Sequence, residues 1–85
     1  MPLYFFHVRD GEDILLDPDG TQIDELAAIA EIALKAARSL ISDDALAGHI
    51  TLEPRIEVED SAGEVVHRLD FADAVRITRA KTVPV

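Results

Sequence analysis

The sequence predicts an α+β domain with the element order ββαββ and a short C-terminal helix, in which a small, mostly antiparallel sheet packs on one long helix. Three segments predict it. Residues 3–17 and residues 54–69 each have the pattern of a β-hairpin, with aromatic or β-branched residues around a turn. Between them, residues 24–41 carry apolar side chains at the spacing of one helix face.

The chain is short enough for one domain, which we assign to residues 1–77 of the 85. Residues 78–85 lack hydrophobic periodicity, and we expect them to fray as a C-terminal tail. A domain of this size buries only about 60–65% of the surface that its unfolded chain exposes. Association with a second copy would therefore add stability.

The first hairpin is predicted to run along residues 3–9 and to return along residues 13–17. The dipeptide Asp10-Gly11 suits the positive φ values of a type I′ turn. If it is the two-residue loop, Phe6 lies opposite Leu15. Both faces of this hairpin are then apolar, although a sheet that faces water on one side alternates apolar with polar residues.

A single helix covers only one face of the hairpin, so the other face needs the C-terminal segment or a second subunit. The face left open carries a candidate interaction surface, formed by Leu3, Phe5, His7, Ile14 and Leu16. The leading hypothesis is therefore a non-enzymatic protein-interaction or regulatory module, acting as a homodimer or binding another protein.

The turn Asp17–Gly20 follows, because its proline presets φ at the second position and its glycine accepts positive φ at the end. Asp24 is the predicted N-cap of a helix over residues 24–41, with a further turn that ends at Gly48. The many alanines of this helix would let it lie close to the sheet.

The second hairpin alternates apolar and charged residues, turning at Asp60–Gly63. We expect Glu57 and Arg68 to be neighbours on its wet face. Residues 70–75 resemble a capped helical turn. The side chains expected to point into the core are Ile56, Val58, Val65 and Leu69.

The formal net charge of −9 argues against nucleic acids and anionic membranes as partners. Arg76, Arg79 and Lys81 make the tail locally basic. Weak nucleic-acid binding through this tail is therefore an alternative that the overall charge disfavours. No stretch is apolar enough for a membrane span, no signal peptide is predicted, and cysteine is absent, so we expect a cytoplasmic protein.

No motif predicts a catalytic residue, a cofactor or a metal site, so an enzyme is the less favoured reading. The turn Asp17–Gly20 does not make a calcium loop, because leucines occupy the positions where an EF-hand needs acids. The remaining alternative is a small histidine and carboxylate enzyme or a metal-binding protein. It would use His7 and His67, which could meet if their strands pair.

Four segments together resemble a known family: Tyr4–Gly11, Asp17–Thr21, Ile56–Asp60 and Phe71–Val75. They are similar to the domain-of-unknown-function family 6894, whose members are small proteins common in rhizobia and related bacteria. The resemblance covers nearly the whole chain up to Val75. It implies a bacterial, cytoplasmic, stand-alone domain, and it assigns no activity and no catalytic residue.

Overall fold

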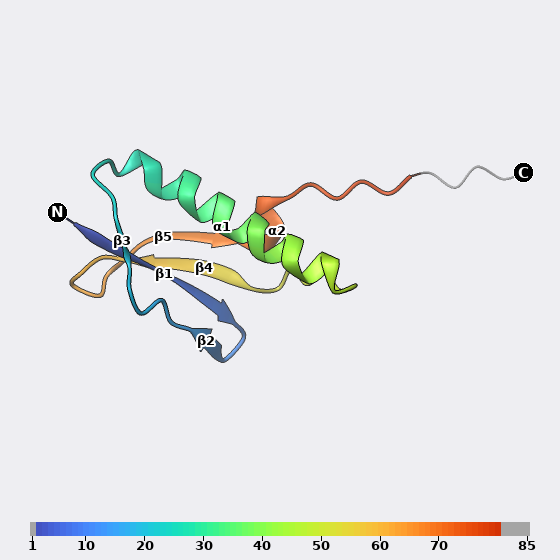
Figure 1. The fold of residues 1–85 in the computed structure, drawn as a ribbon, viewed down its shortest axis with the longest axis horizontal. Helices are drawn as coiled ribbons and strands as arrows, with labels where there is room; N and C mark the ends of the chain where they lie inside the picture. The colour runs from blue at the N-terminus through green and yellow to red at the C-terminus, as the bar shows by residue number, and fades with distance from the viewer. Residues whose placement is uncertain (1, 81–85) are drawn as a thin grey trace, which may run out of the picture.

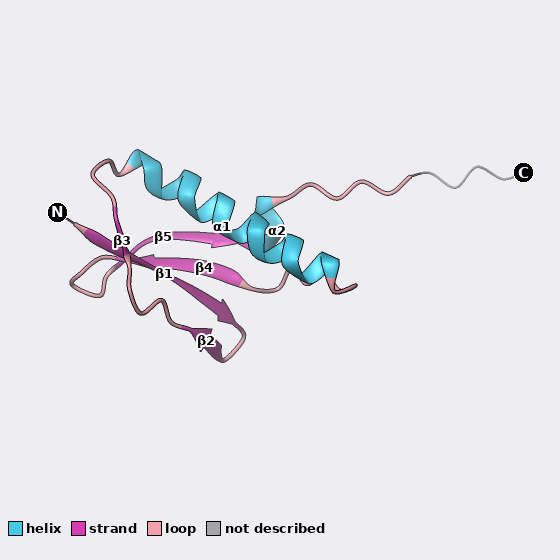
Figure 2. Ribbon diagram, in the orientation of Figure 1, coloured by secondary structure: helices cyan, strands magenta, loops and turns pink. Residues whose placement is uncertain are grey.

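A computed structural model describes residues 2–80, which form one antiparallel sheet with a long helix on one face (Figure 1). This arrangement confirms the predicted α+β class, the ββαββ order and the short C-terminal helix (Figure 2). Within residues 2–80, no helix is long and apolar enough to cross a membrane. The elements of the described residues are β1 (Leu3–Asp10), β2 (Asp13–Leu15), β3 (Thr21–Gln22), α1 (Ala27–Leu46), β4 (Arg55–Glu59), β5 (Val65–Asp70) and α2 (Phe71–Ala74).

The strands lie in the order β2-β1-β4-β5, and β3 also pairs with β1. The predicted return strand at residues 13–17 is therefore shorter than expected, and a second short strand continues the pairing after the turn Asp17–Gly20. This turn interrupts the pairing along β1 instead of simply connecting a hairpin to the helix. Of the predicted tail, residues 78–80 are exposed without regular structure, and residues 81–85 lie outside the described part.

The pairing of β1 with β2 differs from the predicted register by two residues, because Leu15 lies opposite Val8 and not opposite Phe6. The loop begins at Gly11, whose φ is +62°, and no residue other than glycine has a positive φ in the described chain. A type I′ turn at Asp10-Gly11 would need a positive φ at Asp10 as well, whereas a type II′ turn needs it only at its first loop residue. A shift of two residues leaves each side chain on its predicted face.

Helix α1 begins at Ala27, so the predicted N-cap at Asp24 is wrong. The N–H groups of Ala28 and Ile29 instead donate to backbone carbonyls of the preceding turn, at 3.0 and 3.1 Å. Backbone groups thus satisfy donors that an aspartate cap would otherwise take. The helix ends at Leu46, two residues before the predicted end.

The hydrophobic core lies between α1 and the sheet, with α1 packed mainly on β4 and β5. Ala33 and Ala37 have no exposed surface, which shows that the small side chains let the helix approach the strands closely. The buried apolar residues are Tyr4, Ile23, Ile29, Ala33, Ala37, Ile41, Ile56, Val58, Phe71 and Ala74.

A β-bulge in β5 changes the predicted orientation of Val65. The pairing passes from Val58 opposite His67 to Glu59 opposite Val65, which leaves Val66 as an extra residue. Val65 therefore shares the face of Glu59, away from α1, and its predicted place in the core is wrong. A bulge of this kind reverses the alternation of one strand against its neighbour.

The turn Asp17–Gly20 folds over the sheet face opposite α1 and covers part of it. Gly20 has a φ of +73°, and a Cβ atom added there would lie 2.9 Å from Cε2 of the Phe5 ring. The glycine is thus needed both for its backbone conformation and for the close approach of the turn to Phe5. The chain itself therefore supplies part of the cover that we expected from a partner.

Replacing Gly20 with alanine should lower the free energy of unfolding by about 2–3 kcal/mol, because the strain of positive φ adds to the contact with Phe5. Gly63→Ala is the matched control, since Gly63 has a φ of +83° with nothing within 4 Å of an added Cβ. It should cost only about 1 kcal/mol. Chemical denaturation of both variants measures the difference, and equal losses would contradict the packing of Gly20 on Phe5.

Candidate functional site

The sheet face opposite α1 is mostly polar, and its charged residues come from three neighbouring strands. Residues paired directly across antiparallel strands share a face, so the register defines the rows of this surface. We call it the open face. Its rows are Phe5–Glu59, His7–Glu57–Arg68 and Arg9–Arg55–Asp70.

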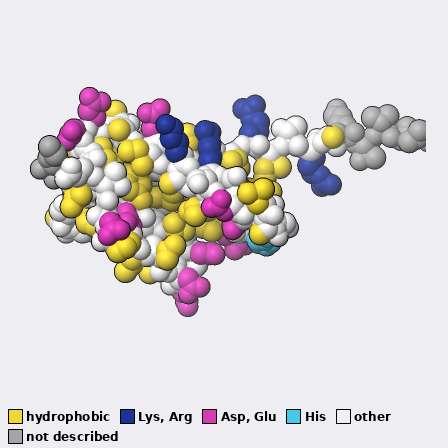
Figure 3. Space-filling model, in the orientation of Figure 1, with side chains coloured by type: hydrophobic (Ala, Val, Ile, Leu, Met, Phe, Trp, Pro, Cys, Tyr) yellow, Lys and Arg dark blue, Asp and Glu magenta, His cyan; other side chains and the backbone are white. Residues whose placement is uncertain are grey.

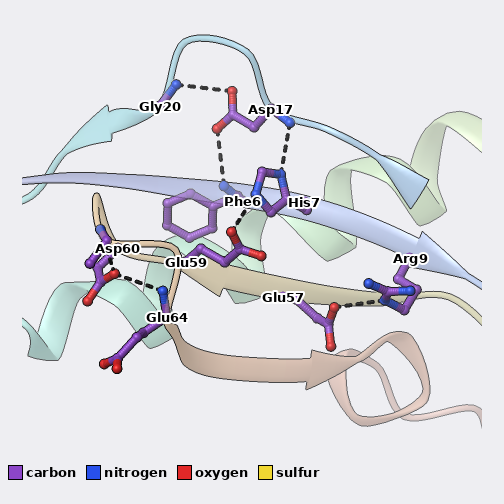
Figure 4. A network of polar contacts seen from close by, with 10 residues as sticks. Phe6, His7, Arg9, Asp17, Gly20, Glu57, Glu59, Asp60 and Glu64 are labelled. Carbon is purple, nitrogen blue, oxygen red and sulfur yellow. Dashed lines mark hydrogen bonds and ion pairs between the residues drawn. The ribbon is translucent and has the colours of Figure 1, made fainter.

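Asp17 closes the gap in the pairing along β1 with its side chain. Its Oδ2 atom accepts a hydrogen bond from the backbone N–H of Phe6 at 3.1 Å, between the β2 and β3 pairings (Figure 4). Its Oδ1 atom accepts from the N–H groups of Asp19 and Gly20, at 3.3 and 3.2 Å. The carboxylate therefore takes the place of a missing strand and also fixes the turn.

His7 is buried beneath the same turn, with 6% of its surface exposed. Its Nδ1 atom accepts a hydrogen bond from the backbone N–H of Asp17 at 3.0 Å, which places the ring hydrogen on Nε2. The Nε2 atom lies 3.5 Å from Oε1 of Glu59, and the ring stacks on Phe5 with the centroids 6.3 Å apart. The contacts of His7 are thus those of a residue that holds a turn in place.

Glu57 is the centre of a cluster of three arginines on the open face, and it is 6% exposed. Its Oε1 atom accepts from Nε of Arg9 at 2.8 Å, and its Oε2 atom accepts from Nε of Arg68 at 3.2 Å. Arg55 places its Nε atom 3.5 Å from Oε2. The predicted proximity of Glu57 and Arg68 is confirmed, but one carboxylate faces three positive charges.

Both anchoring carboxyl groups have a lowered pKa. Burial alone would raise the pKa of Asp17, but the backbone N–H groups of Phe6, Gly20 and Asp19 bring it below the ordinary value. For Glu57, the hydrogen bond from Arg9 is the main cause of the lowered pKa; burial opposes it, and Arg68 adds to it. Both groups are therefore held in the charged form.

The structure does not bring the five residues of the candidate interaction surface together as one apolar patch. His7 is buried, and Leu3 and Phe5 are partly buried. Ile14 is 40% exposed and Leu16 is 61% exposed, on the β2 side of the sheet. The charged residues around Glu57 occupy the rest of the open face, for which the sequence predicted no interaction surface.

The two histidines of the alternative enzyme hypothesis do not meet. His7 pairs with Glu57 on the open face, whereas His67 pairs with Val58 on the side of α1. The strands β1 and β5 are separated by β4, and the two rings lie on opposite faces of the sheet. Within residues 2–80, no group of three or more histidine, aspartate or glutamate side chains is placed to hold a metal ion.

Two cavities accompany these features, one at each end of β5. The first has a volume of about 360 Å³ and lies at one end of the open face, where Arg9 and Arg55 line it together with Glu53 and Asp70. The second, which we call the β5 groove, has a volume of about 240 Å³. It lies between the start of α1 and the start of β5, and its lining is Leu26, Ala27, Ile29, Ala30, Val66 and His67.

Comparison with known proteins identifies the family. Residues 3–72 match the family described as Domain of unknown function (DUF6894). The chain belongs to the DUF6894 family. No curated protein and no solved structure matches this DUF6894 domain. The matched residues include the open face, the turn Asp17–Gly20 and the β5 groove, and they end before the basic tail.

Sequence reasoning missed three features of this DUF6894 domain that the structure reveals. These are the bridge from Asp17 to β1, the arginine cluster around Glu57, and the β5 groove. The alternation in β4 was a usable signal for the second, because it places Arg55 and Glu57 together on the face away from Ile56. The other two depend on which distant segments pair, and no local pattern gives that.

The bridge made by Asp17 predicts a pH dependence of stability. Its folded-state pKa lies below the ordinary carboxyl value of about 4. Its contribution is therefore fully present above pH 4 and is lost as the pH falls through the lower folded-state pKa. Asp17→Asn should be about 1–2 kcal/mol less stable at pH 7 and should lose less stability on acidification. Denaturation from pH 7 to pH 2 tests this, and parallel curves would contradict it.

The cluster around Glu57 predicts a larger effect of neutralisation. Glu57→Gln should cost about 2 kcal/mol, because it leaves the guanidinium groups of Arg9, Arg55 and Arg68 without an anion. The loss stays below that of a fully buried pair because the arginines are partly exposed. The exposed Glu64→Gln serves as a control that should change stability by less than about 0.5 kcal/mol. Equal thermal stabilities of the two variants would overturn this role of Glu57.

Proposed function

We propose that this DUF6894 domain is a non-enzymatic protein-interaction module that forms a homodimer by strand addition. In this proposal, residues 76–80 of one copy lie along β5 of a second copy and place an apolar side chain in the β5 groove. The observation that carries the proposal is a combination on one protein. An open strand edge lies beside an apolar groove, and an exposed segment of similar length carries a charge opposite to that of the protein body.

The edge of β5 is suited to accept a strand. Within the described residues, β5 pairs with β4 alone, so the backbone groups along its other side have no strand partner. The β5 groove lies directly beside this edge. Leu26 and Val66 at its rim are 70% and 45% exposed. An edge strand next to an apolar pocket is the arrangement by which many domains bind extended peptides.

The segment after α2 is suited to provide the strand. Arg38 of α1 donates from Nε to the carbonyl of Ala74 at 2.8 Å, which fixes α2 where the chain leaves the domain. Val75 then has extended backbone, with φ −138° and ψ 155°. The described chain runs away from its own sheet (Figure 1). Ile77 is 62% exposed on this segment and is available to fill an apolar groove.

Length and charge both favour this match. The exposed residues 76–80 are one fewer than the six residues of β5, or about 17 Å of extended chain. All 17 acidic residues of the protein precede Val75, whereas Arg76, Arg79 and Lys81 follow it without any acid. The acidic body of one copy therefore attracts the tail of another. The acidic body also repels the phosphates of nucleic acids, so we do not expect nucleic acids to bind there.

Light scattering at increasing protein concentration tests the proposal. We expect the full chain to reach dimer mass and a variant ending at Val75 to remain monomeric, with circular dichroism confirming that it folds. Leu26→Glu should also prevent dimer formation, because it places a charge at the mouth of the β5 groove.

Leu15→Glu is the matched control, since Leu15 is 69% exposed on β2, far along the sheet from β5. It should leave the dimer intact. Hydrophobic side chains also gather below α1 on the face shown in Figure 3. If the dimer survived loss of the tail but was disrupted by Leu15→Glu, the interface would lie on the β2 side and not at β5. A full chain that is monomeric at millimolar concentration would overturn the proposal.

The proposal also places the protein in a bacterial cytoplasm, which the absence of cysteine supports. A histidine and carboxylate enzyme is less well supported. Nδ1 of His7 is occupied by the N–H of Asp17, and neither cavity described above is lined by His7.

A further inference from the structure

We propose that the cavity between Arg9 and Arg55 binds a small zwitterion of the amino-acid type. Its carboxylate would lie between the two arginines, and its ammonium group would lie near Glu53 and Asp70. This inference is independent of strand addition at β5. It rests on the cavity, on the two arginines and two acids that line it, and on the absence of ion pairs between those arginines and acids within the described residues.

The positive side of the cavity is held in place by the fold. Arg9 and Arg55 are direct cross-strand partners, and like charges in this position repel each other. Glu57 offsets part of the repulsion from the next row, but it also receives the charge of Arg68. One carboxylate is therefore shared among three arginines. A ligand carboxylate between Arg9 and Arg55 would reduce the repulsion that remains between them.

The Nε atom of Arg55 is buried beside Glu57. It lies 3.5 Å from Oε2 of Glu57 and is closed to a ligand in the cavity, which is left with the terminal amino groups of Arg55. Arg9 binds Glu57 through Nε, so this hydrogen bond does not use the terminal amino groups of its guanidinium. Guanidinium groups bind carboxylates in a planar, two-pronged geometry. The cavity therefore offers donors that a carboxylate can use.

The negative side of the cavity restricts the ligand. Glu53 and Asp70 line the same space of about 360 Å³ as the two arginines. No ion pair within 4 Å joins them to Arg9 or Arg55 in the described chain. A doubly charged anion such as phosphate would be repelled by these acids, whereas an ammonium group would be attracted. Leu52 and Ala72 add apolar surface for a short aliphatic side chain.

Three related compounds test the two charges of the ligand one at a time. L-leucine carries both charges, N-acetyl-L-leucine carries only the carboxylate, and L-leucinamide carries only the ammonium group. Titration of the full chain, followed by NMR chemical shifts, should show tightest binding for L-leucine, with shifts confined to the cavity. N-acetyl-L-leucine should bind about tenfold more weakly, since it loses one charge-assisted contact.

Two variants test the assignment of the residues. Arg55→Gln should weaken binding of L-leucine by about tenfold or more. It should fold normally, because it relieves the repulsion between the paired Arg9 and Arg55 and leaves Glu57 bound to Arg9 and Arg68. Asp70→Asn should remove most of the preference for L-leucine over its N-acetyl form. The matched control is Arg68→Gln, which also removes a partner of Glu57 but lies outside the cavity, and it should bind L-leucine within about twofold of the parent chain.

The inference would be overturned if none of the three compounds caused chemical-shift changes at about 20 mM. Binding that is undetectable at this concentration has a dissociation constant well above about 20 mM. The inference would also be overturned by equal binding of L-leucine to Arg55→Gln and to the parent chain. Tighter binding of N-acetyl-L-leucine or inorganic phosphate than of L-leucine would show a simple anion site and would remove the role assigned to Glu53 and Asp70.

Discussion

The carboxylate of Asp17 forms the contact on which the rest of this small sheet depends. β1 carries large side chains on both faces, while α1 covers only one of them. By accepting the N–H of Phe6, Asp17 draws the turn Asp17–Gly20 onto the second face, where it buries His7 and covers Phe5. A short turn thereby provides part of the cover that would otherwise require another layer of structure or another subunit, while Ile14 and Leu16 stay exposed.

The turn Asp17–Gly20 covers one end of the open face, and charged side chains occupy the other end. Beyond His7, the rows consist of arginines and acids, which are held by the buried carboxylate of Glu57. Placing a carboxylate there carries a desolvation cost, which several arginines together offset. The result is a concentrated positive group on an acidic protein, beside a cavity. A surface of this kind is better suited to a charged small molecule than to the apolar docking that the hairpin pattern suggested.

Apolar surface also remains uncovered at the β5 edge of the sheet. One helix does not cover four strands, and α1 lies on β4 and β5, where it forms the β5 groove with the open strand edge. Sheet edges left unpaired attract other strands, and small domains gain stability from such contacts. In the dimer proposed for this DUF6894 domain, the acidic body and the basic extended segment would supply the two halves of such a contact.

Local patterns in the sequence predict the α+β class, the position of the long helix, both turns at Asp17–Gly20 and Asp60–Gly63, and the pairing of Glu57 with Arg68. These features follow from local periodicity and turn chemistry, which act over a few residues. Packing of the whole chain sets the β1–β2 register, the orientation of Val65, the burial of His7 and the meeting of Arg9 with Arg55. Each of these depends on contacts between segments far apart in the chain, whose relative placement is fixed by packing and not by any local pattern.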